Sequence, residues 1–265
     1  MYSSYQLAQK YLKYYFSAFN GKGHGIHSPF VFNFITKILN DKKNYACYPT
    51  IEAERKKLLH NTAQIEVKDF GAGSALISSN KRQIKRIAAS SLKSPKYGQL
   101  LFRMVQYFKL QTLLELGTSF GISSSYLASG NTSGKLYSCE GSPEIAAIAQ
   151  QVFNQLPLKN ICLVEGNFDE TLSRLLQQSG KIDLAFIDGN HRKAPTLLYF
   201  EQILQNCHEQ SIVIFDDIHW SKEMEEAWQI AKANEAVTLS INLFFIGILF
   251  FNKDFKEKQD FIVRF

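Results

Sequence analysis

Residues 113–121 read LLELGTSFG, an apolar run with one acidic residue that leads into a loop between two glycines. The run is typical of a buried β-strand, and the SSSYLA stretch after it is typical of a helix. Gly117 and Gly121 let the backbone turn sharply and pass close to a ligand, because glycine has no Cβ. The N–H groups that begin a helix are unpaired and bind polar groups. The segment therefore predicts a binding loop at the end of a strand.

A second strand-like run, KLYSCE, ends at Glu140, about one βαβ unit after the first run. A carboxylate in that place accepts hydrogen bonds from the diol of a ribose. Glu115, the glycine loop and Glu140 together predict a nucleoside-containing cofactor. We expect it at the carboxyl ends of the first two strands of a parallel sheet.

Strand-like and helical stretches alternate from residue 113 to the end of the chain. This alternation predicts an α/β fold: a Rossmann-like, doubly wound, mostly parallel sheet of seven strands with helices on both faces. The last two runs, TLSINLF and FIGILFF, leave no room for a helix between them, so we expect an antiparallel hairpin at the sheet edge. Gly247, within the hairpin, predicts a bulge or a close approach.

Residues 1–95 show helical periodicity instead, which predicts a helical N-terminal extension packed on a domain formed by residues 96–265. The stretch GKGHGIHSPF at 21–30 is rich in glycine and predicts an ordered loop. The stretch IEVKDFGAGS at 65–74 looks like a strand entering a glycine loop, but no βαβ spacing follows it. We interpret it as a structured loop, in which Asp69 and Ser74 could contribute polar groups to a lid near the active site.

Composition narrows the class of protein. The 265 residues are 45% hydrophobic, and no apolar run reaches the roughly 18 residues of a membrane span. The N-terminal sequence lacks the pattern of a secretory signal, and four scattered cysteines indicate neither a zinc cluster nor a disulfide framework. We therefore expect a soluble, cytoplasmic protein with no membrane partner. The net charge of +6 would attract nucleic acid or acidic substrates, but scattered Lys and Arg residues also fit ordinary solvated faces.

Carboxylates end the fourth and fifth predicted strands. IDLAFIDGNH places Asp188 at one tip, and SIVIFDDIHW places Asp216 and Asp217 at the next. Adjacent tips of a parallel sheet share one edge, where three carboxylates repel one another unless a cation neutralises them. Oxygen ligands favour a hard ion such as Mg²⁺ or Ca²⁺. The sequence thus predicts a divalent-cation site.

His191 follows Asp188 in the turn that leaves the fourth strand. Imidazole titrates near neutrality and can take a proton from a substrate hydroxyl whose pKa the metal has lowered. His191 is therefore the predicted catalytic base. In the alternative interpretation, Asp188 and Asp217 only cap helices and His191 is a solvated loop residue.

At these residues the chain resembles the class I S-adenosylmethionine-dependent methyltransferases, most closely their catechol-type and sugar or antibiotic O-methyltransferase branches. The similarity covers roughly residues 95–265. It implies that the first loop surrounds the methionine end of the cofactor, that the acid ending the second strand binds the ribose, and that residues after the third strand contact the adenine. The cofactor contacts implied are Glu115, Gly117, Thr118, Ser119, Gly121, Glu140, Asn167, Phe168 and Asp188.

The resemblance also implies that Asp188, Asp216 and Asp217 hold the metal, and it places His191 where the catechol branch commonly has a catalytic lysine. The first loop departs from the commonest form of the family, because Thr118, Ser119 and Phe120 replace its central glycine. The fourth strand ends in IDGN rather than in the motif of enzymes that methylate exocyclic amines of bases.

The leading hypothesis is metal-assisted O-methylation of a small hydroxylated molecule by S-adenosylmethionine. The alternatives are a methyltransferase that acts on RNA, motivated by the basic charge, and a non-catalytic cofactor-binding protein of the same fold. A nicotinamide-dependent dehydrogenase is disfavoured because the GxGxxG spacing is missing.

Overall fold

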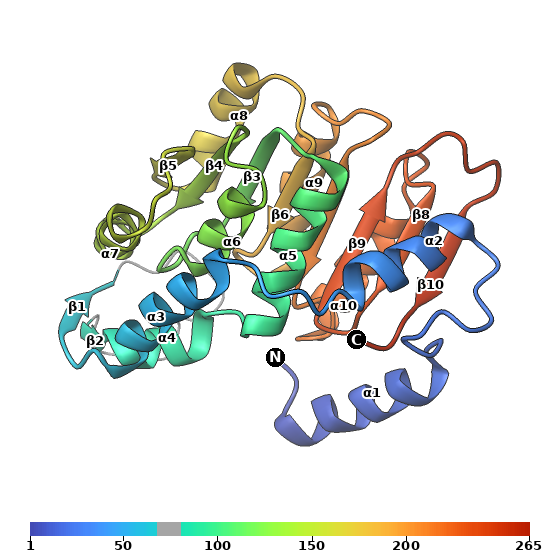
Figure 1. The fold of residues 1–265 in the computed structure, drawn as a ribbon, viewed down its shortest axis with the longest axis horizontal. Coiled ribbons are helices and arrows are strands. Elements are labelled where there is room, and N and C mark those ends of the chain that lie inside the picture. The colour runs from blue at the N-terminus through green and yellow to red at the C-terminus, as the bar shows by residue number, and fades with distance from the viewer. Residues whose placement is uncertain (68–80) are drawn as a thin grey trace. The chain divides into compact units, whose positions relative to one another are not determined.

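The computed structural model of the protein describes residues 1–67 and 81–265. The chain divides into two compact units, whose elements are labelled in Figure 1. The first unit comprises residues 1–41 and 180–265, and the second comprises residues 42–179.

The second unit contains three parallel strands, with β4 in the middle. The strands are β3 (Thr112–Leu116), β4 (Lys135–Glu140) and β5 (Ile161–Glu165). The helices that alternate with them are α6 (Ile122–Gly130), α7 (Pro143–Gln155) and α8 (Phe168–Ser179). Leu113, Leu114 and Leu116 of β3 are all fully buried, as the apolar run predicts.

Three further helices belong to this unit: α3 (Cys47–His60) and α5 (Pro95–Phe108) pack on α6, and α4 (Ile84–Ser91) packs on α3. Their core is aromatic, with Tyr48, Phe102 and Tyr126 packed together. The hydroxyl of Tyr126 in α6 donates to Glu52 of α3 at 2.7 Å. Helices α3 and α5 thus pack against α6, the helix that follows the loop beginning at Gly117.

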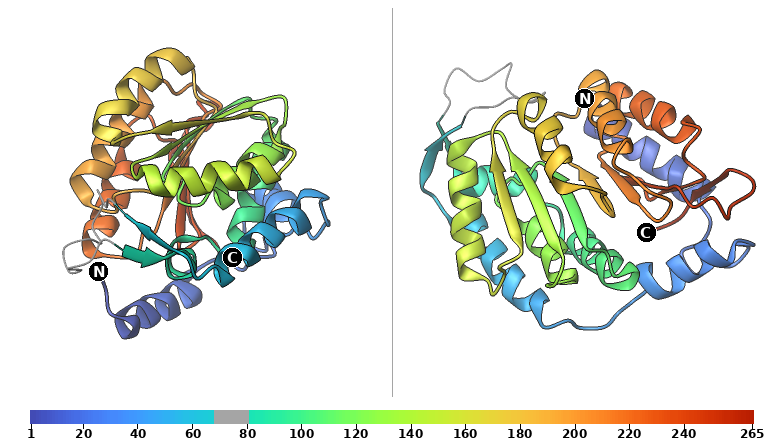
Figure 2. Two further views of the ribbon diagram at one scale, coloured as in Figure 1. Left: turned by 90° about the vertical axis from the view of Figure 1, so that its left-hand side faces the viewer. Right: turned by 90° about the horizontal axis from the view of Figure 1, so that it is seen from above.

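A small antiparallel pair, visible in teal in both views of Figure 2, joins β1 (Gln64–Glu66) to β2 (Lys81–Gln83). No strand–helix–strand unit of the kind found at β3 starts from β1 in the part of the chain that the structure describes. Asp69 and Ser74, predicted as polar groups of a lid, lie outside the described residues.

The first unit contains five strands in the order β10-β8-β9-β7-β6. They are β6 (Leu184–Ile187), β7 (Ile212–Asp216), β8 (Leu239–Asn242), β9 (Ile246–Phe250) and β10 (Gln259–Ile262). Strands β6 and β7 are parallel, and β9 is antiparallel to both β7 and β8. The helices are α1 (Ser4–Ser17), α2 (Pro29–Asn33), the π-helical segment η1 (Phe34–Leu39), α9 (Lys193–Leu204) and α10 (Lys222–Ala233).

The predicted α/β class and the antiparallel hairpin, β8–β9, are both confirmed. The hairpin does not form the edge, however, because β10 adds to β8 in parallel. Apart from the small pair β1–β2, the described residues therefore contain eight strands, three in the second unit and five in the first, rather than the seven expected. The close approach predicted at Gly247 is present: a Cβ there would lie 2.5 Å from the Trp228 ring.

Helix α1 packs on the same unit through one face. Tyr14 and Ala18 are buried with Phe244, and Lys10 forms an ion pair with Glu225 of α10 at 2.9 Å. The loop at 21–30 ends where Pro29 begins α2, as predicted. Within the described residues, no helix has both the length and the apolar character needed to cross a membrane.

Candidate functional site

The glycine loop after β3 adopts the left-handed conformations that its glycines predict. Gly117 and Gly121 have φ values of 105° and 78°, and Ser119 between them has a φ of 48°. The N–H groups of Gly117 and Thr118 both donate to the carbonyl of Cys139 at 3.0 Å. The loop is therefore tied to the end of β4 and closely follows the backbone there.

Gly121 begins α6 at a place with no room for a side chain. A Cβ on this residue would lie 2.4 Å from the ring of Phe153 in α7. The glycine is thus required twice, by its backbone conformation and by the close packing of α6 against α7.

Glu140 connects the ends of β3 and β4. Its Oε2 accepts from the N–H of Ser119 at 2.9 Å, and its Oε1 accepts from the N–H of Ser142 at 3.0 Å. Sequence reasoning assigned Glu140 to a ribose diol, and the structure adds that it fixes the glycine loop. Both carboxylate oxygens of Glu140 thus accept from backbone N–H groups, one in the glycine loop and one after β4.

Asn167 and Phe168 follow β5 beside Glu140. The N–H of Gly166 donates to the carbonyl of Glu140 at 2.9 Å, which joins the two strand ends. The side chain of Asn167 accepts from the N–H of Asp169 at 3.2 Å, at the start of α8. The structure thus brings together the first loop, Glu140 and Asn167, which the resemblance assigned to the methionine, ribose and adenine parts of one cofactor.

Glu115 lies at the centre of a buried polar network. Its Oε2 accepts from the hydroxyl of Ser124 and from that of Ser138 at 2.6 Å. Thr118 extends the network through a 2.6 Å bond to Ser138. The other carboxylate oxygen, Oε1, is buried and makes no hydrogen bond within the described residues. A donor brought by a ligand would therefore find an acceptor there.

Burial raises the pKa of the Glu115 carboxyl to about 7, while the neighbouring serine hydroxyls act to lower it. The nearby carboxylate of Glu140 adds to the increase. At neutral pH the network therefore holds a carboxyl that a positively charged ligand group would convert to its ionised form.

Sequence reasoning missed the serines of this network. Ser124 and Ser138 are fully buried, one in a helix and one in a strand. The available signal was Ser138 itself, since a polar residue in the apolar run KLYSCE needs a buried partner. Ser91 of α4 was also missed, although its hydroxyl lies 2.8 Å from that of Ser119.

In the first unit, Asp188, His191 and Asp216 lie together beyond the ends of β6 and β7. One potential ligand atom of each lies within 4.8 Å of the others, and Asp216 is fully buried. The Nε2 atom of His191 is 3.7 Å from an oxygen of Asp188. Asp217, predicted as a third ligand, is adjacent to Asp216 in the chain but is not part of this group among the described residues.

The backbone around this group is strained. Asn190 and His191 have φ values of 68° and 33°, and Asp217 has a φ of 51°. Non-glycine residues seldom adopt such values, and they cluster at binding sites where the surrounding structure enforces them. Here the side chain of Asn190 donates to the Tyr199 hydroxyl at 3.1 Å, and the His191 ring packs on Trp220 at 5.6 Å.

The donor set fits a divalent cation. Two carboxylates and an imidazole at this spacing supply hard oxygen ligands and one nitrogen ligand. Carboxylates suit Mg²⁺ and Mn²⁺, whereas a nitrogen ligand shifts preference towards transition metals. His191 can therefore act as a ligand or as a base, but its Nε2 atom cannot do both at once.

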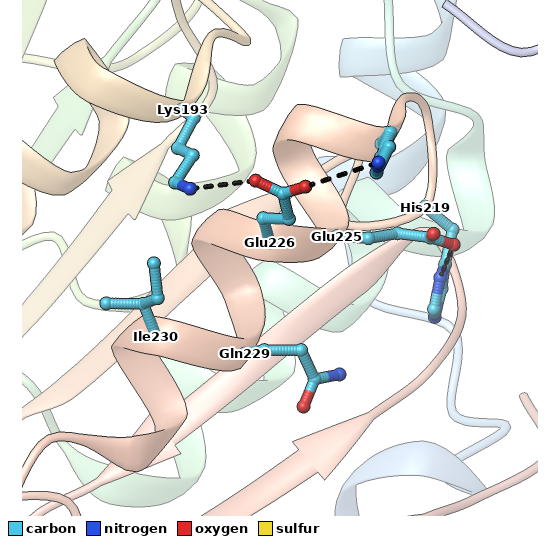
Figure 3. A pocket seen from close by; sticks show the side chains of 7 residues that line it. Lys193, His219, Glu225, Glu226, Gln229 and Ile230 are labelled. Atoms are coloured by element: carbon cyan, nitrogen blue, oxygen red, sulfur yellow. Dashed lines mark hydrogen bonds and ion pairs between the residues drawn. The ribbon is translucent and has the colours of Figure 1, made fainter.

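A pocket of about 540 Å³ lies along α10 in the same unit (Figure 3). Ion pairs between side chains line it: Lys193 with Glu226 at 2.7 Å, and His219 with Glu225 at 2.9 Å. His219 is one of the residues that line this pocket. Neither Asp188 nor Asp216 is among its lining residues, so it is separate from the carboxylate group.

The sequence of residues 114–218 matches a family described as "Methyltransferase domain". This range runs from the first loop to the acids that follow β7. The resemblance to class I S-adenosylmethionine-dependent methyltransferases is confirmed by this match and by the fold.

The relatives carry similar names. A "Catechol O-methyltransferase" of Niastella koreensis is 28% identical over 128 residues, which are 47% of this chain and 57% of that protein. The chain thus spans little more than half the length of this curated relative. An SAH-bound Podospora anserina methyltransferase, PaMTH1, has the same fold with a TM-score of 0.59 at 14% identity, over 96% of this chain and 98% of that one. An O-methyltransferase from Bacillus cereus, in complex with SAH, gives a TM-score of 0.55 at 18% identity, covering 83% and 96%.

Proposed function

We propose that the protein is an S-adenosylmethionine-dependent O-methyltransferase that methylates a hydroxyl of a small molecule with the help of a divalent cation. The observation that carries the proposal is the group formed by Asp188, His191 and Asp216, in which two carboxylates and an imidazole lie within reach of one ion. The catechol O-methyltransferase name of a relative supports the choice of oxygen as the acceptor atom.

We propose that S-adenosylmethionine binds along the loops that follow β3, β4 and β5. Glu140 would accept from the ribose diol, and the N–H groups that begin α6 at Gly121 would face the methionine carboxylate. The buried Oε1 of Glu115 would accept from a cationic group of the methionine end. Asn167 and Phe168 would contact the adenine.

The reaction moves the sulfonium methyl group to an acceptor oxygen, releases S-adenosylhomocysteine and transfers the hydroxyl proton to a base. A divalent cation would lower the pKa of that hydroxyl and orient it. Asp188 and Asp216, with Asp217 as the third ligand that the sequence predicts, would hold the cation. His191 would then be the base, unless its imidazole is itself a ligand.

The test is transfer of a labelled methyl group to a set of small hydroxylated aromatics and sugars. Activity should vanish with a chelator and return with Mg²⁺ or Mn²⁺, and Asp217→Asn should lower turnover much more than cofactor affinity. His191→Ala should slow transfer strongly, while the matched control His208→Ala should not, because His208 pairs with Asp183 through a 2.8 Å contact outside the carboxylate group. Full activity in chelator would remove the metal from the proposal.

His191→Ala also separates the two roles of the imidazole. If His191 is the base, the variant still binds the cation but transfers methyl groups slowly. If it is a ligand, cation affinity falls by about 10- to 100-fold or more. Calorimetric titration of Mn²⁺ measures this difference without relying on turnover.

Residues 1–95, the extension predicted from the sequence, are proposed to supply part of the acceptor pocket. The contact between Ser91 and Ser119 supports this role, because it joins α4 to the cofactor loop. Limited proteolysis that left an equally active core would contradict the assignment. A cytoplasmic location stays a prediction from the sequence.

A further inference from the structure

Helix α1 is apolar on two sides, and only one of them is covered. Its inner side contributes Tyr14 and Ala18 to the core of the first unit. On its outer side, Tyr5, Leu12 and Phe16 are 73%, 55% and 78% exposed. Their spacings of seven and four residues place them on a single helical face.

Neighbouring side chains widen this face. Tyr15, next to Phe16 in the helix, is 43% exposed, and Met1 and Phe19, which lie just outside the two ends of the helix, are 83% and 41% exposed. Isolated exposed apolar residues are ordinary, but a contiguous set of this kind marks an interaction surface. We call residues Met1, Tyr5, Leu12, Tyr15, Phe16 and Phe19 the outer face of α1.

The two charged residues of α1 are both lysines, of which Lys10 is paired with Glu225 and Lys13 is exposed. Residues 1–40 contain no Asp or Glu and four lysines, Lys10, Lys13, Lys22 and Lys37. Lys13 is exposed next to Leu12. Arg264 lies at the end of the helix, with its guanidinium 4.3 Å from the centre of the Tyr15 ring. A partner that is apolar and carries anionic groups would complement the exposed side chains together with Lys13 and Arg264.

We propose that the outer face of α1 binds the surface of an anionic lipid bilayer. Tyr, Phe and Leu are the side chains that enter the boundary between headgroups and acyl chains, and lysines beside them attract anionic headgroups. With 14 residues, α1 is shorter than the roughly 20 that a span requires, so it would lie along the surface. The sequence predicted no membrane partner because it lacks a span, but surface binding needs none.

A second copy of the chain fits the outer face less well. A symmetric dimer brings the same patch of both protomers together. Lys13 would then face basic groups, with no acidic residue anywhere in residues 1–40 to neutralise them. Anionic headgroups supply the missing charge.

Contacts on the inner side of α1 connect the helix to α10 and to the loop after β7 in the first unit. The Tyr2 hydroxyl and Lys10 both bind Glu225 of α10, at 2.8 Å and 2.9 Å. The N–H of Tyr2 donates to the carbonyl of Trp220 at 3.0 Å, and the Trp220 ring packs on His191. A bilayer held by α1 would therefore lie near the loop that packs on the carboxylate group.

Co-sedimentation of the full chain with lipid vesicles tests the proposal. We expect binding to vesicles of phosphatidylglycerol and at least about tenfold weaker binding to vesicles of phosphatidylcholine. Phe16→Ser and Leu12→Ser should each lower the partition coefficient about tenfold, and Lys13→Glu should lower it on anionic vesicles only. Leu198→Ser is the matched control, because Leu198 is 47% exposed on α9 and should have no effect.

Circular dichroism and thermal melting should be unchanged in all four variants, since the substituted side chains are exposed. Absence of binding to anionic vesicles would overturn the proposal, and so would equal losses in Leu198→Ser and Phe16→Ser. Sedimentation equilibrium provides the remaining outcome. A dimer that Phe16→Ser dissociates, with no binding to vesicles, would assign the outer face to a second copy.

Discussion

Glu115 is fully buried, and its two oxygens differ in environment. Oε2 accepts hydrogen bonds from two serine hydroxyls, and Oε1 makes no hydrogen bond within the described residues. Its pKa of about 7 reflects the desolvation that the serines only partly offset. Two consequences follow at the scale of single residues, one for stability and one for cofactor binding.

Stability should fall as pH rises through the interval set by Glu115. The pKa is about 7 in the folded state against 4.5 for an ordinary glutamate, so below pH 4.5 both states are protonated and the full stability is present. Between these values the unfolded chain releases its proton first, and roughly 3 kcal/mol of stability is lost once the pH exceeds 7. Glu115→Gln should remove this dependence. Urea unfolding of both proteins over this range measures it, and parallel curves would contradict the assignment.

Ser138→Ala should raise the pKa of Glu115 further, because the carboxylate loses a donor at 2.6 Å. If the cationic end of the cofactor binds Glu115, affinity for S-adenosylmethionine should fall several-fold at neutral pH and recover at mildly alkaline pH. Ser133→Ala, at an exposed site just before β4, is the control. Calorimetric titration at the two pH values decides, and a loss independent of pH would point to simple loss of packing.

These residues show what the sequence could and could not predict. Glu115 and Glu140 are recognisable because acids that end apolar runs stand out against their neighbours. Ser138 could be suspected of having a buried partner, but its pairing with Glu115 and Ser124 could not be predicted, because these side chains become adjacent only when α6 and β4 fold. Similarly, the sequence favoured Asp217 over His191 as a ligand, whereas the turn at Asn190 and His191 brings the imidazole to the carboxylates.

At the scale of elements, alternation of strands and helices is the reliable signal. It predicted β3 to β9, because strands that are buried or partly buried between helices have largely apolar sequences. Strand β10 was missed because Gln259–Ile262 is short and only partly buried, and a segment rich in lysine precedes it. Its pairing depends on the edge offered by β8, which only the folded unit provides.

The turn from β3 into α6 gives a prediction at this scale. Gly121→Ala combines a φ of 78° with a Cβ only 2.4 Å from Phe153, so it should destabilise the fold by about 2–4 kcal/mol. Gly180→Ala has a similar φ of 73° but nothing within 4 Å of its Cβ, so it should cost only about 1 kcal/mol. Urea unfolding of both variants separates backbone strain from the clash. Equal losses would mean that packing of α6 on α7 is unimportant.

At the scale of the whole molecule, a bound ion should stabilise the native state. Asp188, His191 and Asp216 come together only on folding, so the unfolded chain offers no equivalent site. Saturating Mn²⁺ should therefore raise the melting temperature by a few degrees in the wild type and not in Asp188→Asn. Asp183→Asn, which removes the carboxylate paired with His208, should respond like the wild type. An equal shift in Asp188→Asn would place the ion elsewhere.

The class of the molecule could be predicted from the glycine loop and the strand-end acids, but its acceptor could not. Substrate choice depends on pocket walls made by loops and helices without a shared pattern. The pocket beside α10 illustrates this, since Lys193, His219 and Glu225 reach it from separate segments. The outer face of α1 could likewise not be predicted from the sequence, because only the structure shows which apolar side chains of the helix are buried and which are exposed.

The central claim is that the loops after β3, β4 and β5 bind S-adenosylmethionine, and direct calorimetric titration tests it. We predict micromolar binding of S-adenosylmethionine and of S-adenosylhomocysteine, and no binding of NAD. Glu140→Ala should weaken binding by about tenfold or more, because the diol loses a charged acceptor. Glu165→Ala, opposite Glu140 in the register but exposed, should bind normally. A preference for NAD, or unchanged affinity in a folded Glu140→Ala variant, would contradict the account.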